Sequence, residues 1–368
     1  MKLQRFGPAA ALLASVVALA GCGSDNNTTS TPSSSGSAGS ASDCVSGTFN
    51  TAGSSAQKPA FNAWIDGYQA KCSGATVNYD GAGSGAGRTQ FIQKQVPLAG
   101  SDSHLKEEQV AQADARCTGG KAVNIPMVLT PVAIIYNVQG VSKLTVSPTA
   151  LAKIFSGKIT TWNDPEIAKI NSGVTLPSTS ITSVHRASDS GTTDNFTKFL
   201  DAQDPTNWTY GTGQAWKAPG GQGAKDSAAV VQTVKSTDGA IGYVDGPDAK
   251  KNNLTPAKLD TGNGPVEISP ESVGKAIEKA DVSTDGPDIT IKINYGLKEP
   301  GAYPAVLATY EITCTAGLPA EQVPFVRTFL TYTASAEGQG KLAPLGYIQL
   351  PAGLLSKVTQ SVSSLPAS

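Results

Sequence analysis

The spacing of hydrophobic residues along the chain alternates between helical and extended patterns. Three- and four-residue spacing, typical of an amphipathic helix, joins four large side chains: Phe61, Trp64, Ile65 and Tyr68. Residues 75–79 fit a short strand instead, and the apolar stretch 127–136 predicts a buried one. Residues 181–185, 239–244 and 305–314 predict further strands. The alternation predicts an α/β fold with largely parallel sheets, in which ligands bind at the carboxyl ends of strands.

Two helix starts are marked by a capping residue followed by proline. Ser147-Pro148 and Asp164-Pro165 each place a side-chain oxygen at the N-cap and a proline in the first turn. The first of these helices is expected to run through Phe155. Both signals place helices between predicted strands, as the alternation requires.

The N-terminal segment has a different pattern, typical of an exported protein. Two basic residues precede the apolar residues 9–20, which are too few to span a bilayer but suit a signal peptide. The sequence LAGC at 19–22 resembles a bacterial lipobox. We therefore predict that residues 1–22 are a lipoprotein signal peptide and that lipidated Cys22 anchors the chain to the outer face of the cell membrane. An ordinary signal peptide with an incidental cysteine is the alternative.

Composition limits the classes of function. Residues 23–43 are rich in Ser, Thr, Gly and Asn and predict a flexible tether. With 368 residues, 39% of them hydrophobic, the chain can bury a sizeable core, and its length suggests about two domains. Without Lys2 and Arg5, 26 of the 28 basic residues remain against 29 acidic ones, a net charge of −3. This balance disfavours nucleic acid as a partner, and an anion would need a local site.

Four cysteines follow Cys22, and an even number in an exported protein predicts two disulfides. Three pairings can be drawn. We favour Cys44–Cys72, which brackets a helical segment, and Cys117–Cys314, which would tie the early chain to the late chain.

Two predicted junctions between a strand and a helix are rich in Gly, Ser and Thr. They span residues 78–87 and 185–193. A helix start offers unpaired backbone N–H groups, and glycine lets a small anion approach them closely. Hydroxyls add donors, and Arg186 can present a charged fork to two oxygens. Two such junctions facing each other would enclose a tetrahedral oxyanion, although each alone also fits an ordinary turn or a capped helix start.

Asp102 follows another short apolar stretch, and a carboxylate normally repels an anion. It suits a ligand that carries a proton for the carboxylate to accept, as monohydrogen phosphate does and sulfate does not. The alternative is that Asp102 only caps the helix ahead of it.

Motifs of other protein classes are missing from the sequence. No Gly-x-x-x-x-Gly-Lys-Ser/Thr loop and no Gly-x-Ser-x-Gly elbow occurs. Ser103-x-x-Lys106 matches a penicillin-binding signature, but no Lys-Thr-Gly follows it. No Cys-x-x-Cys spacing occurs, and His104 and His185 are better explained as structural or surface residues. The sequence predicts no metal, no cofactor and no enzyme activity.

Several segments together resemble a known family. They are GSSA at 53–56, GSGAG at 83–87, AGSD at 99–102, IFSGKITTWNDP at 154–165, Arg186 with SGTT at 190–193, and GAIGYV at 239–244. In this order they are similar to the high-affinity phosphate-binding proteins of bacterial ABC-type phosphate uptake systems, particularly actinobacterial lipoproteins. The similarity runs from about Cys44 to the C-terminus.

The resemblance implies a two-lobed periplasmic-binding-protein fold of type II, with the ligand in the cleft between the lobes. The first lobe would hold residues 44–128 and 306–368, and the second residues 129–305. Eight residues would bind phosphate by position: Ser55, Ala56, Ser84, Asp102, Arg186, Ser190, Gly191 and Thr192. Of these, Asp102 would accept the phosphate proton and Arg186 would pair with its charge.

Two positions depart from the family pattern. The family commonly has an aromatic residue where Ala56 stands, so some closure of the pocket would be lost. The family also usually has an aspartate two residues after the arginine. Here Ser188 occupies that position and Asp189 comes one residue later, so Arg186 could be oriented differently.

These features predict an extracytoplasmic receptor that closes around inorganic phosphate and delivers it to a membrane-embedded ABC permease with its ATPase. We expect a monomer held at the membrane through its lipid anchor. The alternatives are a receptor for another oxyanion, such as molybdate or sulfate, a secreted phosphatase of related architecture, and a phosphate sensor or surface adhesin that kept the fold.

Overall fold

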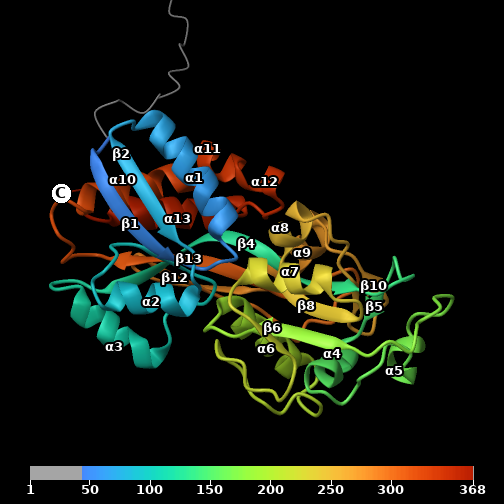
Figure 1. The fold of residues 1–368 in the computed structure, drawn as a ribbon. Coiled ribbons are helices and arrows are strands. Elements are labelled where there is room, and N and C mark those ends of the chain that lie inside the picture. Colours follow the sequence, from blue (N-terminus) through green and yellow to red (C-terminus); the bar gives the residue numbers. More distant parts are fainter. Residues whose placement is uncertain (1–43, 368) are drawn as a thin grey trace, which may run out of the picture. The chain divides into compact units, whose positions relative to one another are not determined.

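A computed structural model describes residues 44–367. Its main sheet has eight strands in the order β2-β1-β3-β13-β4-β8-β6-β7 (Figure 1). These strands are β1 Gly47–Gly53, β2 Ala75–Asp80, β3 Ala99–Ser101, β4 Ala122–Asn137, β6 Thr182–Arg186, β7 Gln222–Ala224, β8 Ala240–Asp245 and β13 Val306–Cys314. A three-stranded sheet and a hairpin complete the strands: β5 Thr145–Val146, β9 Lys258–Asp260 and β10 Pro265–Val266, and β11 Asp281–Asp285 with β12 Asp288–Lys292.

Helices connect and cover these strands. They are α1 Lys58–Lys71, α2 Ser84–Ile92, α3 Glu107–Arg116, α4 Pro148–Phe155, α5 Pro165–Ala168, α6 Gly191–Gln203, α7 Ser227–Ser236, α8 Gly246–Lys251, α9 Pro270–Glu278, α10 Val323–Ala334, α11 Ala336–Gly340, α12 Leu342–Leu345 and α13 Ala352–Ser364. Ser147 accepts a hydrogen bond from the backbone N–H of Ala150, and Asp164 accepts one from Glu166. Both predicted N-caps are therefore confirmed.

The long strand β4 links two groups of strands. Its first part pairs antiparallel with β13, and its second part, from Val132 to Asn137, pairs antiparallel with β8. Strands β1, β2 and β3 on one side pair parallel to one another, as do β6, β7 and β8 on the other. The prediction of largely parallel sheets is thus correct for the two groups and wrong for the strands between them, because β4 and β13 run in opposite directions where they meet.

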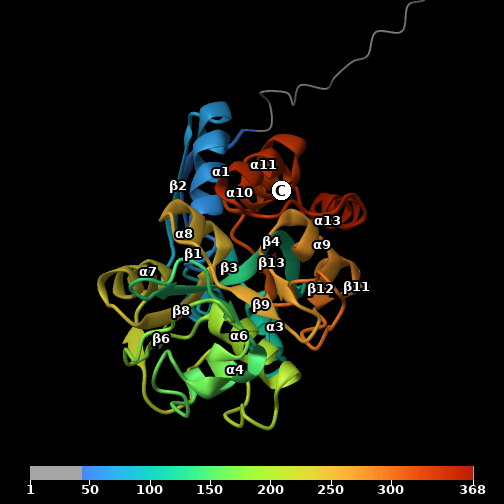
Figure 2. The same ribbon diagram turned by 90° about the vertical axis from the view of Figure 1, so that its right-hand side faces the viewer.

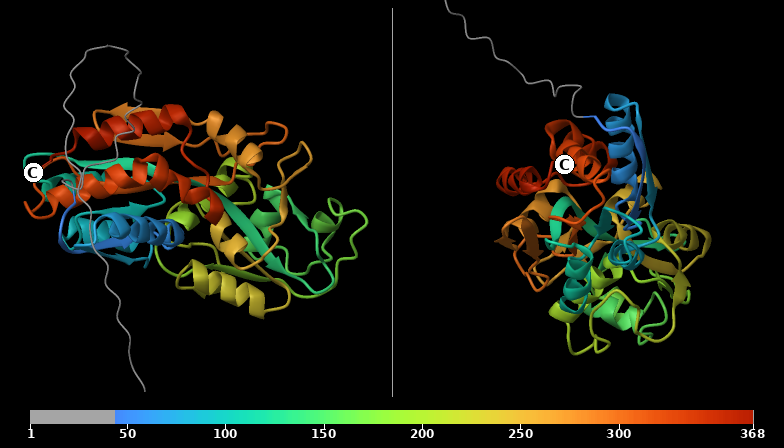
Figure 3. Two further views of the ribbon diagram at one scale, coloured as in Figure 1. Left: turned by 90° about the horizontal axis from the view of Figure 1, so that it is seen from above. Right: turned by 90° about the vertical axis from the view of Figure 1, so that its left-hand side faces the viewer.

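The two groups of strands define two lobes. The first contains β1, β2 and β3 with helices α1 and α2, and the second contains β6, β7 and β8 with α6 and α7 (Figure 1). Figures 2 and 3 show α10, the first of the four helices after β13, lying beside α1, so the last part of the described chain returns to the first lobe. The indole N–H of Trp64 in α1 donates to the carbonyl of Gly338 in α11 at 2.9 Å, which adds a second link to this part of the chain.

Aromatic clusters fill the core of each lobe. In the first lobe Phe61 packs against Tyr79 with ring centroids 4.1 Å apart, and Phe49 stacks on Phe325 at 4.1 Å. In the second lobe Phe196 stacks on Tyr243 at 4.3 Å. The burial of these large apolar rings is the main contribution to the stability of each lobe.

Both favoured disulfides are formed. Cys44 pairs with Cys72 and brackets α1, and Cys117 pairs with Cys314 and ties the end of α3 to the end of β13. Among the described residues, no helix is long and apolar enough to cross a membrane. The predicted signal peptide, lipidated Cys22 and tether lie outside the described residues.

Candidate functional site

Three turns of the first lobe meet at one edge of the sheet. β1 ends at Gly53 and is followed by Ser54, Ser55 and Ala56 ahead of α1. β2 leads to α2, which begins at Ser84, and β3 leads directly to Asp102. Because β1 pairs parallel with both β2 and β3, the carboxyl ends of all three strands lie together.

The second lobe supplies one strand–helix junction. Arg186 is the last residue of β6, and Ser190 caps α6 by accepting a hydrogen bond from the N–H of Thr193. The first residues of α6 are Gly191 and Thr192, and both are buried. Their backbone N–H groups lie at the positive end of the helix, where negative charge is favoured.

Arg186 joins the two lobes. Its Nη1 donates to the Ser55 hydroxyl at 2.9 Å and to the Ser190 hydroxyl at 3.1 Å. Its Nη2 donates to the Ser188 hydroxyl at 3.0 Å and to the carbonyl of Lys225 at 3.2 Å. The side chain is 2% exposed, and burial lowers the pKa of its guanidinium below the ordinary value.

Two buried donors near this junction are unsatisfied. Within residues 44–367, the Nε of Arg186 and the Oγ1 of Thr192 have no hydrogen-bond partner. Buried donors of this kind destabilise a protein by about 1–3 kcal/mol each unless a ligand or water satisfies them. Both belong to residues that sequence analysis assigned to the phosphate site.

Asp102 lies at the centre of the first lobe's hydroxyl groups. Its Oδ2 accepts hydrogen bonds from Ser54 at 2.7 Å and Ser84 at 3.2 Å, and its Oδ1 accepts one from Thr309 at 2.9 Å. Burial raises the pKa of this carboxyl, and the three hydrogen bonds and the charge of Arg186 oppose the rise. The alternative that Asp102 caps a helix is wrong, since α3 begins at Glu107 after Lys106 as its N-cap.

Two glycines allow the lobes to touch. A Cβ atom on Gly191 would lie 2.6 Å from the Cβ of Asp102 and 2.6 Å from the hydroxyl of Ser84. A Cβ atom on Gly85 would lie 2.4 Å from the Cβ of Asp189, and the N–H of Gly85 donates to the Asp189 carbonyl at 3.3 Å. Any side chain at either position would therefore push the lobes apart.

The eight predicted residues lie at these strand–helix junctions, and five of them are joined by hydrogen bonds: Arg186 to Ser55 and Ser190, and Ser84 to Asp102. Ala56 differs in one respect, because its N–H donates to the hydroxyl of Ser54 at 3.1 Å. Sequence analysis did not assign Ser54 or Thr309. Ser54 stands within the family segment at 53–56, whereas Thr309 lies inside an apolar strand and carries no local signal.

The family aspartate after the arginine is replaced in a specific way. The Ser188 hydroxyl accepts from Arg186 and itself donates to the carbonyl of Lys225 at 2.8 Å. Asp189 contacts Gly85 of the first lobe instead. A neutral hydroxyl thus restrains the arginine, and the positive charge of Arg186 is left for another partner.

Two further buried acids were missed by sequence analysis. Glu311 on β13 accepts a hydrogen bond from the Gln57 amide, and burial raises its pKa to about 7. Burial also raises the pKa of Asp245, at the end of β8, well above its ordinary value, and Asp248 next to it strengthens the rise. The two histidines have structural surroundings: the ring of His185 stacks on Trp216 at 4.7 Å, and that of His104 meets Tyr310 edge-on at 6.2 Å.

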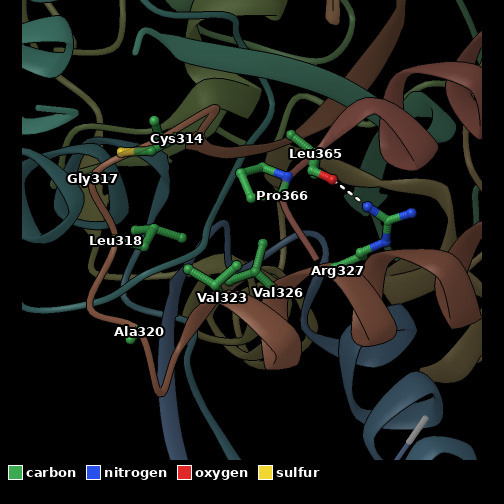
Figure 4. Close-up of a pocket in the computed structure, with 10 residues that line it drawn as sticks. Cys314, Gly317, Leu318, Ala320, Val323, Val326, Arg327, Leu365 and Pro366 are labelled. Atoms are coloured by element: carbon green, nitrogen blue, oxygen red, sulfur yellow. Dashed lines mark hydrogen bonds between the residues drawn. The ribbon is translucent and has the colours of Figure 1, made fainter. Parts of the chain in front are cut away.

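A separate pocket near the end of β13 has a lining unlike that of the candidate site. Figure 4 shows this pocket at the end of β13, where Arg327 donates to the carbonyl of Leu365. Its lining is mainly apolar, and its volume is about 230 Å³. None of the eight predicted residues lines it. Within the described part of the chain, no group of three or more His, Cys, Asp or Glu residues is arranged to hold a metal ion.

The fold and this donor-rich cluster between two lobes define the class of two-lobed, type II periplasmic binding proteins. The model of the PBP superfamily domain matches residues 38–337. The chain is 40% identical to the phosphate-binding protein PstS 3 of Mycobacterium leprae, over 99% of this chain and 100% of that protein. It is 33% identical to the phosphate-binding protein PstS of Pasteurella multocida, over 84% and 88%. The chain belongs to the PstS family of phosphate-binding proteins.

Solved structures agree on the fold. A phosphate-binding protein from Stenotrophomonas maltophilia aligns with a TM-score of 0.64 and 22% identity, covering 85% of this chain and 93% of that one. A high-affinity periplasmic phosphate-binding protein crystallised with phosphate aligns with a TM-score of 0.67 and 22% identity over the same shares.

Proposed function

We propose that this protein captures inorganic phosphate between its lobes and delivers it to an ABC-type importer. The observation that carries the proposal is that buried Arg186 of one lobe donates to Ser55 of the other, close enough to buried Asp102 for its charge to lower the pKa of that carboxyl. Unsatisfied donors of Arg186 and Thr192 suit the oxygens of an oxyanion, and Asp102 suits a ligand that still carries a proton. Monohydrogen phosphate meets both demands.

Each predicted residue takes a role in this proposal. Ser55, Ser84 and Ser190 donate from their hydroxyls or backbone, and Ala56, Gly191 and Thr192 donate from helix starts. Asp102 accepts the phosphate proton, and Arg186 pairs with the charge. Since Ala56 already donates to Ser54, its donation to phosphate requires a small rearrangement of that turn.

The lobe limits form part of the same proposal. Residues 44–128 with 306–368 make the first lobe, and residues 129–305 make the second. The change of partner along β4, from β13 to β8 at Val132, supports a boundary in this region. Bending of β4 and β13 there would open and close the site.

Membership of the family supports the proposed location and partners, and the lipobox-like sequence at 19–22 supports the lipid anchor. The relatives are named as binding proteins, and we propose that this chain likewise binds and carries phosphate without transforming it. It acts outside the cytoplasm as a monomer, is held at the membrane by lipid on Cys22, and passes phosphate to a permease with its ATPase.

Isothermal titration of the purified ectodomain tests the function. Phosphate should bind tightly, arsenate should bind nearly as well because it shares the shape and the proton, and sulfate and molybdate should bind poorly. A folded ectodomain that binds sulfate as well as phosphate, or binds neither, would refute the proposal.

A further inference from the structure

A further contact, between two side chains, joins the lobes without using any of the predicted phosphate ligands. The hydroxyl of Ser103, in the loop after β3, donates to Oδ2 of Asp194 in the first turn of α6 at 2.6 Å. The two residues are 7% and 3% exposed. A charged hydrogen bond that is this well shielded from water is stronger than a surface one.

Arg88 supports this contact from the first lobe. Its Nη1 donates to the carbonyl of His104 at 3.0 Å, which braces the loop that carries Ser103. The guanidinium is 1% exposed, and its Nε has no partner among the described residues. Burial lowers the pKa of Arg88, and the negative charge of Asp194 is the main influence that opposes this.

The charges around the contact come from both lobes. Lys198, one turn along α6, donates to the same oxygen of Asp194 at 2.7 Å. The negative charges of Asp189 and Asp102 also raise the pKa of Arg88, against the effect of burial. The charge of Asp194 likewise adds to the raised pKa of Tyr295, which burial mainly causes. When the lobes separate, Asp194 keeps its ion pair with Lys198, because both residues belong to α6. It loses the hydrogen bond from Ser103 and the attraction to the positive charge of Arg88.

We propose that Ser103, Arg88 and Asp194 form a latch that stabilises the closed lobes and slows the release of phosphate. The latch rests on the proposed function, because its effect is measured through phosphate binding. Its three residues are not among the predicted phosphate ligands and act as positioning residues. A bond present only in the closed form shifts the equilibrium by its own free-energy difference between the two forms.

The latch is placed where water can replace it. A cavity of about 580 Å³ borders Ser103, His104 and Lys198. On opening, water from this cavity can solvate the Ser103 hydroxyl and the Asp194 carboxylate. The open form therefore has no unsatisfied polar groups at this place, and the hydrogen bond stabilises only the closed form.

The test measures phosphate binding and release by stopped-flow fluorescence and calorimetry on the full ectodomain. Ser103→Ala should weaken phosphate binding about tenfold, the usual effect of one charged hydrogen bond. The dissociation rate should rise by most of that factor, with the association rate changed less. Ser103→Thr, which keeps the hydroxyl, should restore slow release, and Ser236→Ala, at an exposed serine of α7, should leave both rates unchanged.

A double-mutant cycle separates the latch from a general loss of structure. Asp194→Asn alone should also speed release, and adding it to Ser103→Ala should change release less than the sum of the single effects. Additive effects, or unchanged release in Ser103→Ala while the wild type binds phosphate, would overturn the latch. A wild-type ectodomain that binds no phosphate would instead refute the proposed function.

Discussion

The two lobes bring opposite chemistry to the site. The first lobe supplies a carboxylate, Asp102, surrounded by three hydroxyl donors from Ser54, Ser84 and Thr309. The second lobe supplies a guanidinium, Arg186, and the start of α6. If phosphate is the ligand, the second lobe provides most of the attraction and the first lobe provides the discrimination. Affinity and selectivity should then respond to mutations in different lobes.

The largest effect is expected in the second lobe. Arg186→Ala removes the positive charge and all the guanidinium donors from a buried site, and each lost charged hydrogen bond is worth about 1.5–3 kcal/mol. Phosphate affinity should fall by roughly 1000-fold, as measured by calorimetry. Near-native affinity would show that the attraction comes from elsewhere and would break the contrast between the lobes.

Asp102→Asn tests the first lobe. The amide can donate a hydrogen bond, so the variant should accept a fully ionised anion that the wild type rejects. The preference for phosphate over sulfate should fall by roughly 100-fold, while phosphate affinity changes less. Competition binding with the two anions measures the ratio, and an unchanged ratio would remove Asp102 from selectivity.

A pH series examines a second buried acid of the first lobe. Because burial raises the pKa of Glu311 to about 7, the folded protein holds this proton to higher pH than the unfolded chain does. The free energy of unfolding should therefore fall as pH rises from about 4.5 to about 7, by up to about 3 kcal/mol.

Glu311→Gln should remove the part of that slope that Glu311 contributes, while Asp102 and Asp245, whose pKa values burial also raises, keep theirs. Denaturant titrations at pH 5 and pH 8 should show that the free energy of unfolding falls less with rising pH in the variant than in the wild type. The control Glu278→Gln, at an exposed position, should behave like the wild type. Equal slopes in the wild type and Glu311→Gln would mean that the carboxyl is ionised throughout.

The smallest effect concerns the surface where the lobes meet. Gly85→Ala places a methyl group against Asp189 and should prevent full closure of the lobes. Phosphate affinity should fall by about tenfold or more. Small-angle scattering with saturating phosphate should report a more open molecule than the wild type. Gly274→Ala, where an added Cβ meets open space, is the matched control and should close normally.

Several parts of the site could be read from the sequence because they are local. Ser190 stands at the N-cap of α6 and Gly191 opens that helix, and both lie close in sequence to Arg186. Short-range signals of this kind depend on a few consecutive backbone N–H groups. The same reasoning explains why the N-caps at Ser147 and Asp164 were predicted correctly.

Contacts between distant segments could not be read in this way. Thr309 reaches Asp102 across 207 positions of sequence, and Ser103 reaches Asp194 across 91. Neither Thr309 nor Asp194 differs locally from an ordinary strand or helix residue. Their roles appear only when the sheet order places β13 beside β3 and brings α6 against the loop after β3.

The amino-acid sequence by itself determined the kinds of chemistry present: helix starts rich in donors, one arginine, one carboxylate among small residues, and cysteines for two crosslinks. Only the tertiary structure decided how these groups are oriented, since it gave the N–H of Ala56 to Ser54 and directed the Ser188 hydroxyl to Arg186. Local backbone preferences act over a few residues, whereas the pairing of buried polar groups is decided by the packing of whole lobes.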